Sequence, residues 1–113
     1  MEKIYNKLVR DRIPEIIENN GETPITRVLD NQEYKKELEK KLLEEYNEVL
    51  ETTSSNDRLE ELADMLEVMV SLATLENANL NDIITIMNEK KEKRGGFSKK
   101  FFLEKVQSNW KKL

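Results

Sequence analysis

Apolar residues recur along this chain with the three- and four-residue spacing of α-helices. The pattern predicts four helices, at about residues 13–20, 31–52, 57–77 and 80–93. In the shortest, Pro14 suits a first turn and Gly21 suits the position just past a helix end. Residues 26–29 are candidates for extended chain. Helices therefore account for most of the predicted regular structure.

Capping residues set the expected helix boundaries. Helix N-caps are predicted at Asp11, Asp30, Asn56 and either Asn79 or Asn81. Asp30 with Glu33 has the spacing of a capping box. The hydroxyl run at 52–55 should end the longest helix, because these side chains compete for backbone hydrogen bonds. Gly95 and Gly96 should end the last helix.

The fold class follows from these helices and their short connections. Glycine and proline are scarce, with three and two residues, so few turns interrupt the chain. Short loops make successive helices antiparallel neighbours. We therefore predict a single all-α domain over residues 1–113, an antiparallel helical bundle with an irregular N-terminal arm and a basic C-terminal tail. The tail has interleaved aromatic residues up to Trp110, and its segment 101–106 is expected to be extended or a short helix.

Carboxylates interrupt the apolar stripes of the two middle helices. One stripe comprises Leu38, Leu42, Glu45 and Val49, and the other comprises Glu61, Met65, Val68 and Leu72. A second apolar arc of the 57–77 helix comprises Leu59, Leu62, Leu66, Met69 and Ala73. Glu45 with Glu48, and Glu61 with Asp64, are three residues apart and project from one helix face each. A carboxylate directed toward a core is costly unless a cation offsets it, so a divalent metal is a candidate ligand. The alternative is a solvated face of glutamates, and the pattern alone leaves both open.

The residue types that are missing narrow the chemistry. The chain has neither cysteine nor histidine, which excludes disulfides, zinc–thiolate sites, histidine ligands and Ser-His-Asp catalysis within it. Oxygen ligands alone favour Mg²⁺, or Mn²⁺, over zinc or copper. No segment has the roughly 18 apolar residues of a membrane span and no signal peptide is evident, so a cytoplasmic protein is expected.

Charge is distributed unevenly along the chain. Residues 30–76 contain 14 acidic and 5 basic residues, and residues 90–113 contain 9 basic and 2 acidic residues. Lys90, Lys93 and Arg94 are candidate phosphate ligands, although basic residues also suit a helix C-terminus. Lys7, Arg10 and Arg12 are further candidates, with a simple docking arm as the favoured alternative. Nucleic-acid binding is not favoured, because the acidic middle would repel a duplex.

At these residues the chain resembles the MazG-related all-α nucleoside triphosphate pyrophosphohydrolases. Their acidic motif, EExxE followed by ExxD, is matched by 44–48 and 61–64, with twelve residues between. The pair Lys90 and Arg94 before Phe97 is similar to the family's basic segment. The opening 7–14 resembles a subgroup described as phosphoribosyl-ATP pyrophosphohydrolase-like.

The resemblance implies an enzyme that cleaves nucleoside triphosphates between the α and β phosphates, releasing a monophosphate and pyrophosphate. It implies that Glu45, Glu48, Glu61 and Asp64 bind Mg²⁺ and carry catalysis, with Glu44 as a possible outer neighbour. Lys90 and Arg94 would neutralise the triphosphate. A homodimer or homotetramer is implied as well. Hydrolysis of phosphoribosyl-ATP and a catalytically inactive helical interaction module remain the alternatives.

Overall fold

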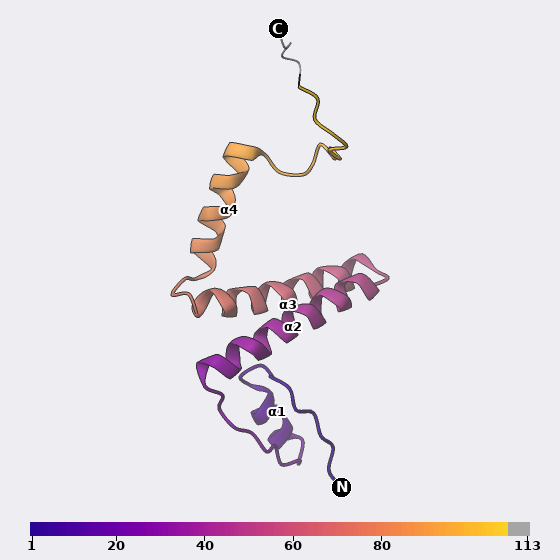
Figure 1. Ribbon diagram of the computed structural model, residues 1–113. Helices are drawn as coiled ribbons and strands as arrows, with labels where there is room; N and C mark the ends of the chain where they lie inside the picture. Colours follow the sequence, from indigo (N-terminus) through magenta and orange to yellow (C-terminus); the bar gives the residue numbers. More distant parts are fainter. Residues whose placement is uncertain (109–113) are drawn as a thin grey trace. The chain divides into compact units, whose positions relative to one another are not determined.

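The computed structural model describes residues 1–108, and the regular structure in this range is entirely helical (Figure 1). The helices are α1 (Ile13–Asn19), α2 (Asn31–Glu51), α3 (Ser55–Thr74) and α4 (Leu80–Arg94). The all-α prediction is confirmed, and residues 26–29 form no strand. The chain divides into two compact units, Met1–Leu80 and Asn81–Leu113. None of the helices in the described range is long and apolar enough to cross a membrane.

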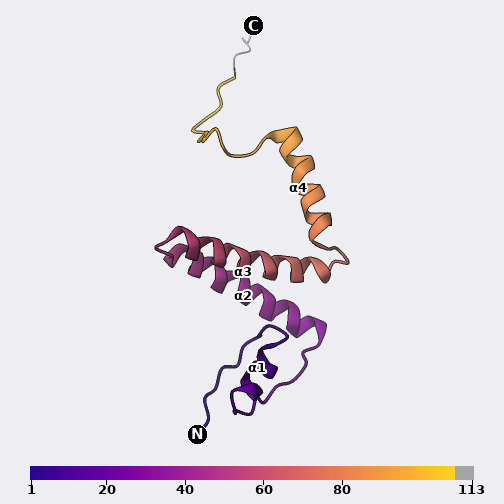
Figure 2. The ribbon, with the colours of Figure 1, turned by 180° about the vertical axis from the view of Figure 1, so that it is seen from behind.

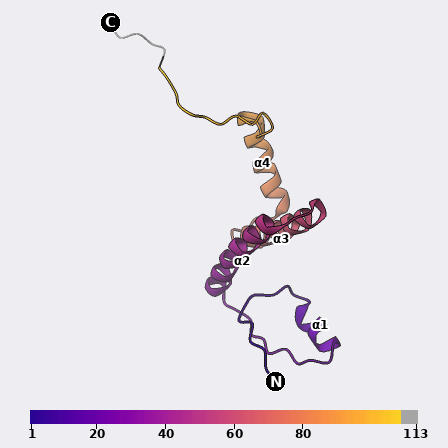
Figure 3. The same cartoon turned by 90° about the vertical axis from the view of Figure 1, so that its right-hand side faces the viewer.

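The first unit is built on the pairing of α2 with α3, which run side by side in opposite directions (Figures 1 and 2). Leu38, Val49 and Val68 form its buried apolar core, with exposed fractions of 3%, 5% and 6%. These residues belong to the two stripes expected from the sequence. Lys7 and Leu8, which precede α1, line a small hollow with residues of the first two thirds of α2. α1 itself lies apart from α2 and makes no contact with it (Figure 3).

The start of α2 agrees with the expected cap, although the capping box is one-sided. The backbone N–H of Glu33 donates to Asp30 Oδ1 at 2.8 Å. The Glu33 carboxylate does not return to the cap but accepts a hydrogen bond from Arg27 at 2.9 Å. An arginine just before the helix therefore takes the place of the second half of the box.

Two predicted caps are wrong. α3 begins at Ser55, and its N-cap is Ser54, whose Oγ accepts from the Asp57 N–H at 3.2 Å, rather than Asn56. Asp57 lies three residues after Ser54, a spacing that suits an N-cap serine. α1 begins at Ile13 after Arg12, with no side-chain cap, so Asp11 does not have the predicted role.

The second apolar arc of α3 does not face α2. Leu59, Leu62, Leu66 and Met69 are exposed in the single chain, and Leu59 retains 65% of its accessible surface. On α2, Leu43, Tyr46 and Leu50 are also exposed. The helix pair thus has apolar side chains beyond those that form its own core.

The second unit contains α4 and the chain after it. Gly95 ends α4 with a φ of 82° and donates its N–H to the Lys91 carbonyl at 2.7 Å, as the sequence predicts. Phe97 and Lys100 close a turn through a 3.0 Å backbone hydrogen bond. The segment 101–106 is neither a strand nor a helix. Trp110 lies outside the described residues.

Candidate metal centre

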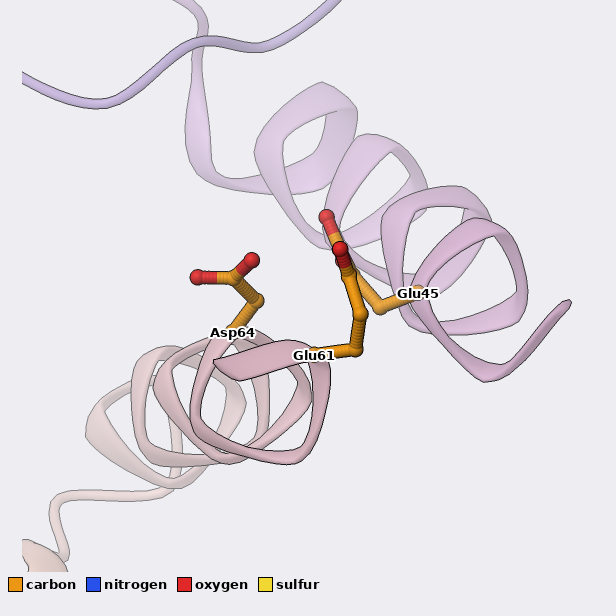
Figure 4. A group of neighbouring side chains, drawn as sticks. All are labelled: Glu45, Glu61 and Asp64. Atoms are coloured by element: carbon orange, nitrogen blue, oxygen red, sulfur yellow. The ribbon is translucent and has the colours of Figure 1, made fainter. Parts of the chain in front are cut away.

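Three carboxylates from the two paired helices converge at one point (Figure 4). Glu45 extends from α2, and Glu61 and Asp64 extend from α3. One carboxylate oxygen from each lies within 4.8 Å of the others. Glu45 and Glu61 meet because both occupy apolar-stripe positions that face the partner helix. Asp64 joins them because it lies about one helical turn after Glu61 on the same side of α3.

One oxygen atom in each of two of these carboxylates is buried without a hydrogen-bond partner. Glu45 is 8% exposed, and it is the charged residue among the buried side chains of the described range. Its Oε2 atom and the Oε2 atom of Glu61 are both buried and accept no hydrogen bond there. Burying a polar group without a hydrogen bond costs about 2–7 kcal/mol when the group is neutral, and more when it is ionised. The chemistry of this donor set fits a hard divalent cation, which would satisfy both oxygens.

Burial and neighbouring carboxylates raise the pKa of two members of this cluster, Glu45 and Glu61. Burial is the main cause that raises the pKa of Glu45 from 4.5 to about 7, and the Glu48 and Asp64 carboxylates add to it. Lys41 opposes the rise through its positive charge. The pKa of Glu61 is also raised, first by a hydrogen bond shared with Glu48 and then by burial. Glu45 therefore exchanges its proton near neutral pH, where a metal ion would compete with that proton for the same oxygens.

Glu48 and Glu44 differ in their relation to this cluster. Glu48 is half-buried and interacts with both Glu45 and Glu61, but it is not one of the three convergent carboxylates. Glu44 lines a separate small hollow of about 40 Å³ together with Lys7 and Lys41. The structure thus brings three of the four predicted ligands together and directs Glu44 elsewhere.

A larger open hollow lies at the turn between α2 and α3. Its volume is about 280 Å³. It is lined by Glu48, Glu51, Thr52, Thr53, Asp57, Glu60 and Glu61. Glu48 and Glu61 connect it to the carboxylate cluster. This lining attracts cations and repels a bare polyphosphate, so an anionic ligand needs a metal ion to approach it.

The predicted basic residues occupy different environments. Arg10 donates a hydrogen bond from Nη2 to Asp64 Oδ1 at 2.7 Å, which links the N-terminal segment to the cluster. Arg12 instead pairs with Glu15 at 3.4 Å. Lys90, Lys93 and Arg94 are exposed on α4 in the second unit.

Two features of the site were not recognised from the sequence. Lys41 lowers the pKa of Glu45, and its position four residues earlier on the same helix could have indicated this. The pairing of Arg10 with Asp64 joins residues 54 positions apart, and no local spacing indicates it.

Comparison with known proteins leaves the chain without an assigned family. No protein-family model matches it. Over 54 residues it is 44% identical to an uncharacterized protein of Mycolicibacterium smegmatis, a stretch that covers 48% of this chain. The chain spans about half of that relative, 55% of its length. No solved structure matches the chain.

Proposed function

We propose that this chain is a Mg²⁺-dependent nucleoside triphosphate pyrophosphohydrolase, which cleaves between the α and β phosphates and releases a nucleoside monophosphate and pyrophosphate. The observation that supports it most is the convergence of Glu45, Glu61 and Asp64, two of them with buried oxygens that have no partner. The type of reaction is proposed from the resemblance of residues 44–48 and 61–64 to the acidic motif of MazG-related enzymes.

Glu45, Glu61 and Asp64 are the residues that would hold the metal. A bound Mg²⁺ would supply the charge that polarises phosphate oxygens and activates water. Glu48 lies beside the three ligands, so we assign it as the base that accepts the proton of the attacking water. Its role as a fourth ligand, which the family resemblance implies, requires the side chain to move into the group.

Cationic side chains are needed on the phosphates that the metal does not neutralise. We assign this role to Lys90, Lys93 and Arg94, which are exposed and belong to a strongly basic segment. Among the N-terminal candidates, Arg10 is the one with a direct contact to the cluster. Nucleoside triphosphates are cytoplasmic metabolites, so the proposal also locates the protein in the cytoplasm.

A homodimer or homotetramer is part of the proposal. Three buried apolar residues are a small core for a helix pair of this length. Domains with so small a core usually need oligomerisation, a disulfide or a metal ion to be stable. Burying the exposed leucines of α2 and α3 against another copy would supply the missing apolar contact. At about 25 cal/mol per Å², each fully buried leucine contributes about 1.5–3 kcal/mol.

The decisive experiment measures pyrophosphate release. The full chain is incubated with Mg²⁺ and a panel of ribo- and deoxyribonucleoside triphosphates, with phosphoribosyl-ATP included. Release is expected with at least one substrate and should be lost in Glu45→Gln. Glu39→Gln is the matched control, because Glu39 is on the same helix but is exposed and outside the cluster.

Each outcome bears on a different part of the proposal. No pyrophosphate from any substrate would contradict the activity and favour the inactive helical module. Full activity in both Glu45→Gln and Asp64→Asn would contradict the site while leaving the activity in place. Release from phosphoribosyl-ATP alone would assign the substrate to that alternative.

A further inference from the structure

A single ion pair connects the N-terminal segment to the carboxylate cluster. The Arg10 guanidinium donates to Asp64 Oδ1 at 2.7 Å, and Asp64 is one of the three convergent carboxylates. Of these three, Asp64 is the one with a cationic hydrogen-bond partner within residues 1–108. Part of the negative charge that a metal ion would use is therefore already neutralised by the chain itself.

The ion pair between Arg10 and Asp64 is exposed to solvent and can be broken without disturbing a helix. The side chains of Arg10 and Asp64 are 58% and 41% exposed, so water can replace either partner. Residues 1–10 contain no helix or strand, and Arg10 is three residues before the start of α1. The guanidinium can thus leave Asp64 without unfolding a helix.

We propose that Arg10 is an internal counter-ion of the cluster, which a divalent cation displaces from Asp64. The inference rests on the metal site of the proposed function. A guanidinium and a divalent cation on the same carboxylate repel each other, and the divalent ion has the stronger attraction for three convergent carboxylates. The N-terminal segment and the cation therefore compete for Asp64.

Displacement gives Arg10 a second role. A guanidinium released from Asp64 stays near the cluster, because Lys7 and Leu8, just before it in the chain, line a small hollow on α2. Arginine binds phosphate oxygens with the same planar set of donors that binds a carboxylate. Arg10 would then exchange a carboxylate of the protein for a phosphate of a metal-bound ligand.

The test measures cation affinity in the absence of nucleotide. Free Mn²⁺ is counted by electron paramagnetic resonance during titration of the full chain, its Arg10→Gln variant and the control Arg12→Gln. An exposed ion pair of this kind should lower affinity by about twofold to fivefold, so Arg10→Gln should bind Mn²⁺ tighter by that factor. Arg12→Gln should match the wild type, because Arg12 pairs with Glu15 away from the cluster. Circular dichroism confirms that each variant is folded.

A second measurement separates displacement from a general effect of charge. The hydrogen bond to Asp64 should slow rotation of the Arg10 guanidinium, which nuclear magnetic resonance spectra of arginine side chains can detect. Its signal is identified by its loss in Arg10→Gln. Adding Mg²⁺ should restore fast rotation at Arg10 and leave Arg12 unchanged. Persistent slow rotation at saturating Mg²⁺ would overturn the displacement.

The outcomes also separate this inference from the proposed function. Equal or weaker Mn²⁺ binding by Arg10→Gln overturns the counter-ion role and leaves the pyrophosphohydrolase standing. Tighter binding by Arg10→Gln in a protein that releases no pyrophosphate supports the counter-ion role and overturns the activity. Absence of Mn²⁺ binding in every variant overturns both.

Discussion

Replacing Glu45 by glutamine should stabilise the metal-free protein at alkaline pH, and the gain should disappear in mild acid. The carboxylate is 8% exposed, its Oε2 atom has no hydrogen-bond partner, and its pKa is raised from 4.5 to about 7. Because the folded-state pKa lies above the unfolded one, folding favours the protonated form. That stability is fully present below about pH 4.5 and is lost as the pH rises through about 7.

The size of the effect follows from the pKa change. A shift of one pKa unit is equivalent to about 1.4 kcal/mol. The pKa of Glu45 is raised partly by its neighbour Glu48, and the pKa of Glu61 is raised as well, so removing the Glu45 charge alone should recover only part of the free energy that corresponds to the rise from 4.5 to about 7. We expect a gain of about 1–2 kcal/mol at pH 8, or roughly 5–15 °C in Tm for a unit of this size. At pH 5 Glu45 is protonated and resembles glutamine, so the two proteins should unfold alike.

The assay is thermal and urea unfolding in a chelator at pH 5 and pH 8, with Glu39→Gln as the surface control on the same helix. The Tm of the wild type should decrease from pH 5 to pH 8, and this decrease should be smaller in Glu45→Gln. Part of the decrease in Tm with pH should remain in the variant, because the pKa of Glu61 is also raised. A variant that is less stable than the wild type at pH 8 would refute the reasoning, because it would show that the Glu45 charge is satisfied in the metal-free fold.

Other predictions address the metal, a helix cap and self-association. Mn²⁺ at a hundred times its Kd should stabilise the wild type by about 2.7 kcal/mol in thermal unfolding and leave Asp64→Asn unaffected; an equal rise in both would exclude Asp64 as a ligand. Ser54→Ala should lower the free energy of unfolding by about 1 kcal/mol, because it removes the acceptor for the Asp57 N–H, whereas Ser55→Ala should change little. If both serine variants unfold alike, the cap contributes nothing. Leu66→Glu should lower the mass observed by analytical ultracentrifugation toward that of one chain, since Leu66 is exposed on α3; a wild-type protein that is already a monomer would contradict the proposed interface.

Helical periodicity predicted the fold class and placed the four helices within a few residues of their observed ends. Local hydrogen bonds determined where the prediction failed. Ser54 and Asn56 are both good N-cap residues, and the choice between them depends on which side chain reaches a free N–H, here that of Asp57. At α1, the chain enters the helix through a turn that uses no side-chain cap, and composition alone does not reveal this.

The site was partly predictable for a simple physical reason. A carboxylate at a position where the pattern requires an apolar residue must face the partner helix if the helix forms at all, which is how Glu45 and Glu61 were identified. Partners far apart in the sequence have no such periodicity, so the contact of Arg10 with Asp64 required the structure. Periodicity also could not decide which of two apolar faces of α3 meets α2, and the arc that includes Leu59 and Leu62 is the face left exposed.

The proposed metal binding would couple stability to function in this helix pair through the composition of its core. Leu38, Val49 and Val68 are the buried apolar residues of the described range, and Glu45 is buried with them. A charge among so few apolar side chains lowers the stability of the metal-free chain. The charge lies between α2 and α3, which must stay aligned for Glu61 and Asp64 to meet Glu45. A cation at this point would remove the repulsion and join α2 to α3, so its binding free energy would add directly to folding. The same carboxylates that make the empty helix pair marginal would thus make the ligand-bound form rigid, which is the condition for holding a phosphate in a fixed position.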